Sequence, residues 1–281
     1  MKKDTTAARS TAIVTGASRG IGQHIARSLA RSGYRLILTA RSGQELEALA
    51  DDLRASGAQA VAVAADVTDP QDQDRIIRAA ESDGGRIDVL VNNAGGDPQR
   101  EFEEMTWEEN EAILRLNLLA PMELTHKLLP GMVSRGKGHV VNISAIAGRV
   151  GFPYLEAYAA AKDGLIAFTR VLRNDFRASG VSSSAVILGA IRDAGQGQRT
   201  SDEMGVVLPK GATSPADAVG SAVARAIEKD QAEVVVMPGP GRLLKALLDL
   251  FPRLGAFLNR RTGANDTMRA VINFRKRNRR G

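Results

Sequence analysis

Residues 15–22 read TGASRGIG, between an apolar stretch at 11–14 (TAIV) and a stretch with helical periodicity at 23–32. This order of strand, glycine turn and helix is typical of a site that holds the pyrophosphate of a dinucleotide at a helix N-terminus. An ordinary glycine-rich loop is the alternative, and the two flanking segments make it the weaker interpretation. The residues of this turn predicted to contact the cofactor are Gly16, Ser18, Arg19, Gly20, Ile21 and Gly22.

Segments with strand and helix character alternate along the chain. Strands are expected at 13–14, 36–39, 60–64, 89–91, 140–143, 184–188 and 233–237, and helices near 20–32, 43–56, 70–83, 107–130, 155–179 and 215–229. Strands joined by helical crossovers require a parallel sheet with helices on both faces. The sequence therefore predicts an α/β doubly wound, Rossmann-type fold, with a single domain over residues 1–240 and a helical, basic extension over 241–281.

The composition is that of an ordinary globular protein and excludes several kinds of chemistry. The 281 residues are 43% hydrophobic and 25% charged, which suits one large α/β core. Without cysteine there is no disulfide, thiolate zinc site or cysteine nucleophile, and three scattered histidines do not suggest a metal centre. Residues 1–4 do not begin an apolar leader, and no stretch approaches the roughly 18 apolar residues of a membrane span. We therefore expect a cytoplasmic protein.

The end of the second predicted strand indicates which dinucleotide binds. In doubly wound folds an acidic residue there binds the adenosine ribose hydroxyls, whereas a basic residue accepts a 2′-phosphate. The strand at 36–39 is followed by Ala40 and Arg41, and Arg19 in the glycine turn can reach the same phosphate. The sequence therefore predicts NADP(H) rather than NAD, with solvated surface arginines as the alternative interpretation.

Tyr158 and Lys162 form the candidate catalytic pair. Their i, i+4 spacing places both side chains on one face of the helix predicted at 155–179. A phenol has an ordinary pKa of about 10, and a neighbouring ammonium favours its ionised form. Such a tyrosine can exchange a proton with a carbonyl oxygen while hydride arrives at the carbon. The pair therefore predicts carbonyl reduction or the reverse oxidation of an alcohol.

With these motifs the chain resembles the short-chain dehydrogenase/reductase family over about residues 10–240. The matching segments are TGASRGIG at 15–22, Asp66-Val67, NNAG at 92–95, Asn117, and Tyr158 with Lys162. The resemblance implies that Asp66 and Val67 contact the adenine and that the NNAG segment braces the adenosine side of the cofactor. The cofactor contacts that it adds to the glycine turn and Arg41 are Asp66, Val67, Asn93, Ala94, Gly95, Tyr158, Lys162 and Gly189.

The same resemblance implies the catalytic roles. Tyr158 is expected to be the general acid or base, and Lys162 to bind the nicotinamide ribose beside it. Asn117 is expected to hold a water in a proton relay to Lys162. Gly189 follows Leu188, where the family commonly has proline, and this departure is expected to alter the mobility of the following loop more than the chemistry.

Residue 145 departs from the family pattern. The family usually has a substrate-orienting serine thirteen residues before the tyrosine, and here that residue is Ala145. Ser144 is adjacent, but successive strand residues point to opposite faces, so we expect its hydroxyl to point away from the substrate unless the strand end bulges. Losing one hydrogen-bond donor at a developing oxyanion costs on the order of a hundredfold in turnover. Three hypotheses remain: a slow reductase using Ser144 or another donor, a binder that has lost its chemistry, and a variant altered to trap substrate.

The sequence predicts an NADP(H)-dependent oxidoreductase acting on a small-molecule carbonyl or alcohol. The competing hypothesis, motivated by Ala145, is a cofactor-bound protein without redox turnover: a binding or scaffold protein, an isomerase or a dehydratase. The family resemblance also implies a homodimer or homotetramer that pairs the helices at 107–130 and 155–179. The polar stretch at 190–213 is expected to be a long substrate loop.

The C-terminal segment carries the positive charge of the chain. Residues 242–281 hold eleven Arg and Lys against two Asp, a net charge of +9, whereas the whole chain has +6. Leucines and phenylalanines recur at helical spacing and predict one or two short amphipathic helices interrupted at Pro252, followed by a basic run at 275–280. The first hypothesis is a lid or subunit contact with a solvated basic end. The second is peripheral attachment to an anionic membrane, which suits a lipid-like substrate, while nothing supports nucleic-acid binding.

Overall fold

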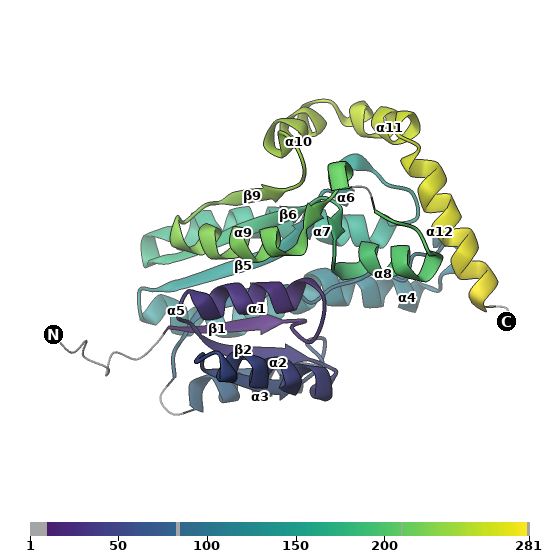
Figure 1. Cartoon of the computed structure of the whole chain (residues 1–281). Helices are drawn as coiled ribbons and strands as arrows, with labels where there is room; N and C mark the ends of the chain where they lie inside the picture. Colours follow the sequence, from purple (N-terminus) through teal and green to yellow (C-terminus); the bar gives the residue numbers. More distant parts are fainter. Residues whose placement is uncertain (1–9, 83–84, 209, 280–281) are drawn as a thin grey trace.

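The computed structural model describes residues 10–82, 85–208 and 210–279, so residues 1–4 and Arg280 lie outside the described residues. At its centre is a seven-stranded parallel sheet with strand order β3-β2-β1-β4-β5-β6-β9 (Figure 1). Its strands are β1 (Thr11–Thr15), β2 (Arg35–Ala40), β3 (Ala60–Ala64), β4 (Ile87–Asn92), β5 (Gly138–Ala145), β6 (Val181–Leu188) and β9 (Glu233–Val236). The predicted doubly wound, Rossmann-type fold is confirmed.

Helices cover both faces of this sheet. They are α1 (Ile21–Arg31), α2 (Gly43–Ala55), α3 (Pro70–Glu81), α4 (Trp107–Leu114), α5 (Ala120–Ser134), α6 (Ala147–Val150), α7 (Glu156–Phe176), α8 (Gly195–Met204), α9 (Ala216–Glu228), α10 (Gly241–Leu250), α11 (Pro252–Arg261) and α12 (Ala264–Arg279). Two short strands, β7 (Ile191–Arg192) and β8 (Ser214–Pro215), pair in parallel beside the main sheet. The carboxyl ends of the parallel strands therefore meet at one edge, where the site is found.

The alternation of strand side chains divides the core into two layers. In β1, Ala12 and Val14 pack with α1, α2 and α9 on one face, whereas Ile13 packs with α3 and α5 on the other. Both faces of the central strands are buried, which explains why these strands read as continuous apolar runs. A third cluster joins α7 and β6 to Leu248 of α10, with Leu254 and Leu258 of α11 packed against it.

The helix predicted at 107–130 is interrupted in the structure. α4 ends at Leu114, a π-helical turn covers Arg115–Leu119, and α5 continues to Ser134 with Pro130 inside it. The single-helix prediction was therefore wrong in detail. Apolar periodicity does not show a π turn, because the insertion changes the backbone hydrogen bonds and leaves the composition ordinary.

The stretch at 190–213 is more ordered than the predicted loop. It contains β7, helix α8 and a short 3-10 turn at Lys210–Ala212. The α8 sequence holds two glycines and few apolar residues, so propensity does not favour a helix. Its buried Thr200 and Ser201 indicate that tertiary contacts stabilise it.

Three helices, rather than one or two, follow β9. α10 and α11 project at one end of the molecule, and α12 runs back to α8, which it contacts (Figure 1). α12 was missed because most of its residues are polar or charged. Only a short apolar stretch, Val271 and Ile272, is deeply buried.

Candidate active site

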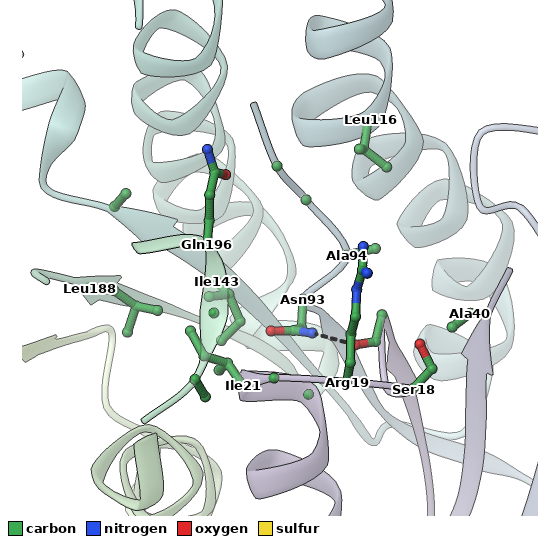
Figure 2. A pocket seen from close by; sticks show the side chains of 18 of the residues that line it. Ser18, Arg19, Ile21, Ala40, Asn93, Ala94, Leu116, Ile143, Leu188 and Gln196 are labelled. Atoms are coloured by element: carbon green, nitrogen blue, oxygen red, sulfur yellow. Dashed lines mark hydrogen bonds between the residues drawn. The ribbon is translucent and has the colours of Figure 1, made fainter. Parts of the chain in front are cut away.

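A cavity of about 680 Å³ lies at the carboxyl ends of the central strands (Figure 2). This volume is within the roughly 300–1,000 Å³ typical of ligand pockets. The structure brings nearly all predicted site residues to its wall: Gly16, Ser18, Arg19, Gly20, Ile21, Gly22, Arg41, Asp66, Val67, Asn93, Ala94, Gly95, Ser144, Tyr158, Lys162 and Gly189, together with Ala145. Asn117 is the predicted residue that does not line the cavity.

The glycine turn is shaped by backbone approaches that admit no side chain. Gly16 has a φ of +67°, and a Cβ there would lie 2.8 Å from the Cα of Ala94. At Gly22 a Cβ would lie 2.2 Å from the carbonyl oxygen of Gly16. Gly20 also has positive φ, and a Cβ there would lie 3.2 Å from the backbone nitrogen of Gly195, the first residue of α8. The turn is thus packed against β4 on one side and against the α8 segment on the other.

Asn93 fixes the loop after β4 to this turn. Its Nδ2 donates to the carbonyl oxygens of Thr15, at 2.9 Å, and Gly16, at 3.2 Å (Figure 2). The backbone amides of Asn93 and Ala94 both donate to the Thr15 hydroxyl at 3.0 Å. A side chain from one strand end therefore sets the conformation of the neighbouring one.

The cavity carries positive charge from three arginines. Arg19 and Arg41 are exposed at the glycine turn and after β2, and Arg199 reaches the same cavity from α8. Within the described part of the chain, no carboxylate forms an ion pair with any of the three. Arg19 and Arg275 lower the pKa of Arg199 by repulsion, second to the effect of partial burial. An anionic group between Arg19 and Arg199 would relieve that repulsion.

Tyr158 and Lys162 lie on one face of α7, as their spacing predicts. The Lys162 Nζ is 5.6 Å from the centre of the Tyr158 ring and donates to the carbonyl oxygen of Ile143 at 3.0 Å. Burial lowers the pKa of Lys162 to about 8. The pKa of Tyr158 is raised well above its ordinary value, by burial and then by the Asp97 carboxylate. The expectation that Lys162 lowers the phenol pKa was therefore wrong for this structure, because desolvation is the larger effect.

Comparison with known proteins identifies the family. The family model described as short chain dehydrogenase matches residues 10–204. This chain belongs to the short-chain dehydrogenase family. It is 37% identical over 238 residues to a protein of Nostoc sp. (strain PCC 7120) named ketoacyl reductase HetN, covering 84% of this chain and 81% of that relative.

Solved structures agree with this assignment. A metagenomic short-chain oxidoreductase in complex with NADP superposes with a TM-score of 0.69 at 32% identity, covering 83% of this chain and 98% of the other. A variant of actinorhodin polyketide ketoreductase with NADPH gives a TM-score of 0.75 at 28% identity, covering 83% and 97% respectively.

Ser144 is not presented to the cavity of this short-chain dehydrogenase as a free donor. Its hydroxyl donates to the carbonyl oxygen of Lys162 at 2.8 Å, and the side chain is buried. β5 and β6 remain in register through Ala145 and Leu188, so no bulge turns Ser144 toward the substrate. The hypothesis of a reductase that uses Ser144 as its donor is therefore not supported: the Ser144 hydroxyl bonds to the backbone of α7, and the Ala145 side chain offers no donor in its place.

Asn117 lies in the π-helical turn behind the cavity wall. Its Nδ2 donates to the carbonyl oxygens of Gly96 and Ile113, both at 2.9 Å, and its Oδ1 accepts from the Gly96 amide at 3.1 Å. A Cβ at Gly95 would lie 2.7 Å from Asn117 Oδ1 and 3.1 Å from Lys162 Nζ. The side chain of Asn117 thus holds the loop after β4 next to Lys162.

Two contributions from α8 and its surroundings were not predicted. Gln196 lines the cavity, and its side-chain amide bonds to the backbone of Asp97 in the loop after β4, accepting at 3.1 Å and donating at 2.7 Å. Burial is the main cause of the raised pKa of Asp97, about 6. Without an expected helix over 195–204, nothing in the sequence indicated which polar residues of that stretch face inward.

The basic end of α12 is paired rather than solvated. Arg275 forms an ion pair with Glu203 of α8 at 3.0 Å and donates to the Thr200 hydroxyl at 3.1 Å. Lys276 pairs with Glu104 at 2.8 Å and also with Glu101, both beside the loop after β4. The expectation of a solvated basic end was wrong for these two residues. α12 ties α8 to the loop that carries Asp97.

Proposed function

We propose that this short-chain dehydrogenase is an NADP(H)-dependent reductase of a ketone, or oxidises the corresponding alcohol. The proposal rests on the position of Tyr158 and Lys162 on one face of α7. Both line the same cavity as the glycine turn. The related structures bound to NADP and NADPH support the choice of cofactor.

The residues of the cavity fit such a cofactor. Gly16 and Gly20 keep the turn free of side chains at the N-terminus of α1, where backbone amides can hold a pyrophosphate. Arg19 and Arg41 would hold the 2′-phosphate, and Arg199 would add a third cation from α8. Asp66 and Val67 would contact the adenine, and Lys162 the nicotinamide ribose.

When bound, the cofactor supplies hydride to the carbonyl carbon. The Tyr158 hydroxyl donates its proton to the carbonyl oxygen, and the Lys162 ammonium stabilises the negative charge left on the phenol. The raised pKa of Tyr158 keeps it protonated at neutral pH, which favours the direction of reduction. Because the pKa of Lys162 is about 8, we expect kcat/KM for reduction to fall above that pH, as Lys162 loses its charge.

A 3-oxoacyl chain is the substrate class that the relatives favour. HetN is named a ketoacyl reductase, and a Synechocystis relative, 36% identical over 181 residues, is named 3-oxoacyl-[acyl-carrier-protein] reductase. Val150 and Phe152 pack with the third apolar cluster between Ala145 and Tyr158. The cavity itself is lined by Leu116, Ile143 and Leu188 among its apolar side chains, and these suit an acyl chain.

The second candidate is a cofactor-bound protein without redox turnover, and two observations favour it. Ala145 has no hydrogen-bonding group, and the Ser144 hydroxyl is already used by Lys162. In a reductase, the hydrogen bond to the developing oxyanion would therefore have to come from Tyr158 alone or from another residue.

The deciding experiment follows NADPH oxidation with a 3-oxoacyl thioester, comparing the natural chain with Ala145→Ser and Tyr158→Phe. We expect slow turnover by the natural chain, a rise on the order of a hundredfold with Ala145→Ser, and loss with Tyr158→Phe. Substrate conversion without loss of NADPH would support the non-redox candidate instead. NADPH fluorescence titration of each variant separates lost chemistry from lost cofactor binding.

We further propose a homodimer or homotetramer built through α4, α5 and α7. Large apolar side chains are exposed on these helices and on the π-helical turn between α4 and α5, namely Trp107, Val171 and Leu119. Burying them against a second copy would remove apolar surface from water. Light scattering gives the mass, and Val171→Glu should lower it.

A further inference from the structure

α10 and α11 present an outer face with four large apolar side chains. Leu243, Leu250, Phe251 and Phe257 are 59%, 72%, 59% and 49% exposed. Figure 1 shows the two helices projecting beyond β9, at one end of the molecule. We call these four residues the α10–α11 apolar face. Several large apolar side chains exposed on two consecutive helices usually mark an interaction site.

The opposite sides of the same helices are anchored in the core. Leu244, Leu248, Leu254 and Leu258 pack against the third apolar cluster. A Cβ at Gly255 would lie 2.5 Å from the carbonyl oxygen of Val150, so α11 lies directly on α6. The fold therefore satisfies one side of each helix and leaves the apolar face uncovered among the described residues.

The charges around the apolar face are almost all positive. Arg242, Arg253, Arg260 and Arg261 are exposed on the two helices. The acid on these helices, Asp249, is paired with Lys245 at 2.8 Å and also lies near Arg149. The face thus combines apolar side chains with exposed arginines, as in helices that lie in the interface of an anionic bilayer.

We propose that the α10–α11 apolar face docks on an anionic lipid bilayer, with its arginines at the headgroups and its leucines and phenylalanines in the acyl boundary. A second copy of the chain is a poorer occupant, because an isologous contact would bring two sets of exposed arginines together. No helix in the described part of the chain is both long and apolar enough to cross a membrane, so the attachment is peripheral.

The docking surface is joined to the segment between Ala145 and Tyr158. Asn259 of α11 donates to the carbonyl oxygens of Val150 and Gly151, at 3.3 and 3.1 Å. That segment follows Ala145 and precedes Tyr158, so docking would bring the chain that connects these two cavity residues close to the bilayer surface. Docking itself does not depend on the proposed reaction and is tested without it.

The test measures co-sedimentation of the full chain with vesicles of phosphatidylcholine, with and without about 30% phosphatidylserine. We expect binding to the anionic vesicles alone, weakened by salt because screening shortens the reach of the arginines. Arg260→Glu with Arg261→Glu should weaken binding by roughly 25-fold or more, about fivefold for each arginine near an anionic surface. Leu250→Glu with Phe257→Glu should abolish it.

The controls place the same changes elsewhere. Val207→Glu alters an exposed apolar residue outside the face, and Arg31→Glu with Arg78→Glu matches the charge change on α1 and α3. These variants should sediment like the natural chain. No binding to anionic vesicles, or equal losses in the controls, would overturn the proposal. The proposal would also be overturned if the natural chain did not bind vesicles and Leu250→Glu lowered the mass of the oligomer. The α10–α11 apolar face would then join two copies of the chain.

Discussion

The two ends of the cavity are held together by different kinds of contact. At the glycine turn, backbone meets backbone: Gly16 and Gly22 leave no room for a Cβ. At α8, side chains make the connection, through Gln196 to the backbone of Asp97 and through Thr200 and Glu203 to Arg275. Close backbone packing leaves no room for a larger side chain, whereas contacts between side chains can be weakened one at a time. The first arrangement needs a fixed glycine spacing, and the second needs no particular sequence motif.

The sharpest test of this contrast replaces one glycine at each end by alanine. In Gly22→Ala the new Cβ would meet the Gly16 carbonyl oxygen at 2.2 Å, so the turn must open. We expect a loss of about 3 kcal/mol in the free energy of unfolding, with loss of NADPH binding. Denaturant unfolding and NADPH fluorescence measure the two effects.

Gly195→Ala is the matched change at α8. Gly195 has a φ of +86°, and a Cβ there would lie 3.1 Å from Cδ1, the end of the flexible Ile21 side chain. The strain of that conformation should cost about 1 kcal/mol, and cofactor binding should largely survive. Equal losses in the two variants would show that both ends depend on backbone packing.

The same contrast explains what the sequence could predict. The glycine turn, the parallel doubly wound sheet and the i, i+4 pair of Tyr158 and Lys162 follow from spacing and periodicity, and the structure brings the predicted site residues together. Helix α8 and the pairing of Arg275 with Glu203 could not be predicted, because they depend on partners far apart in the chain. The pKa of Tyr158 was predicted in the wrong direction because spacing reveals the neighbouring cation but not the burial.

Asp97→Asn tests whether the loop opposite α8 tunes the chemistry. The Asp97 carboxylate raises the pKa of Tyr158, and its own pKa of about 6 means that it is charged above that pH. Oxidation of an alcohol needs the Tyr158 phenolate. Removing the negative charge should therefore lower the pKa of Tyr158 and move the alkaline rise in oxidation toward lower pH, by up to about one unit. The pH profile of kcat/KM for oxidation measures the shift.

Asn keeps the Oδ1 that accepts from the Gln99 amide at 2.7 Å, so the loop should retain its shape. Asp193→Asn is the control, because it removes an exposed carboxylate just before α8. If both variants leave the profile unchanged, Asp97 contributes to loop structure alone. A shift toward higher pH would contradict the sign of the electrostatic effect.

Arg275→Ala tests the side-chain contacts between α12 and α8, and it should have the smallest effect. Its ion pair with Glu203 is partly exposed and is worth at most about 1 kcal/mol, although the bond to buried Thr200 adds to it. We expect KM for the carbonyl substrate to rise about threefold, with kcat and NADPH affinity nearly unchanged, because α8 loosens while the glycine turn does not. Hydrogen exchange should quicken in α8 and remain slow in α1.

Arg269→Ala removes another arginine of α12 for which the described residues provide no ion pair, and it should behave like the natural chain. Arg275→Lys keeps the charge but cannot reach Glu203 and Thr200 together, so it should recover only part of the effect. High salt should reproduce the Arg275→Ala phenotype in the natural chain, because it screens the exposed pair. Faster exchange in α1 as well as α8 would instead mean that α12 stabilises the whole cavity, and the distinction between its two ends would fail.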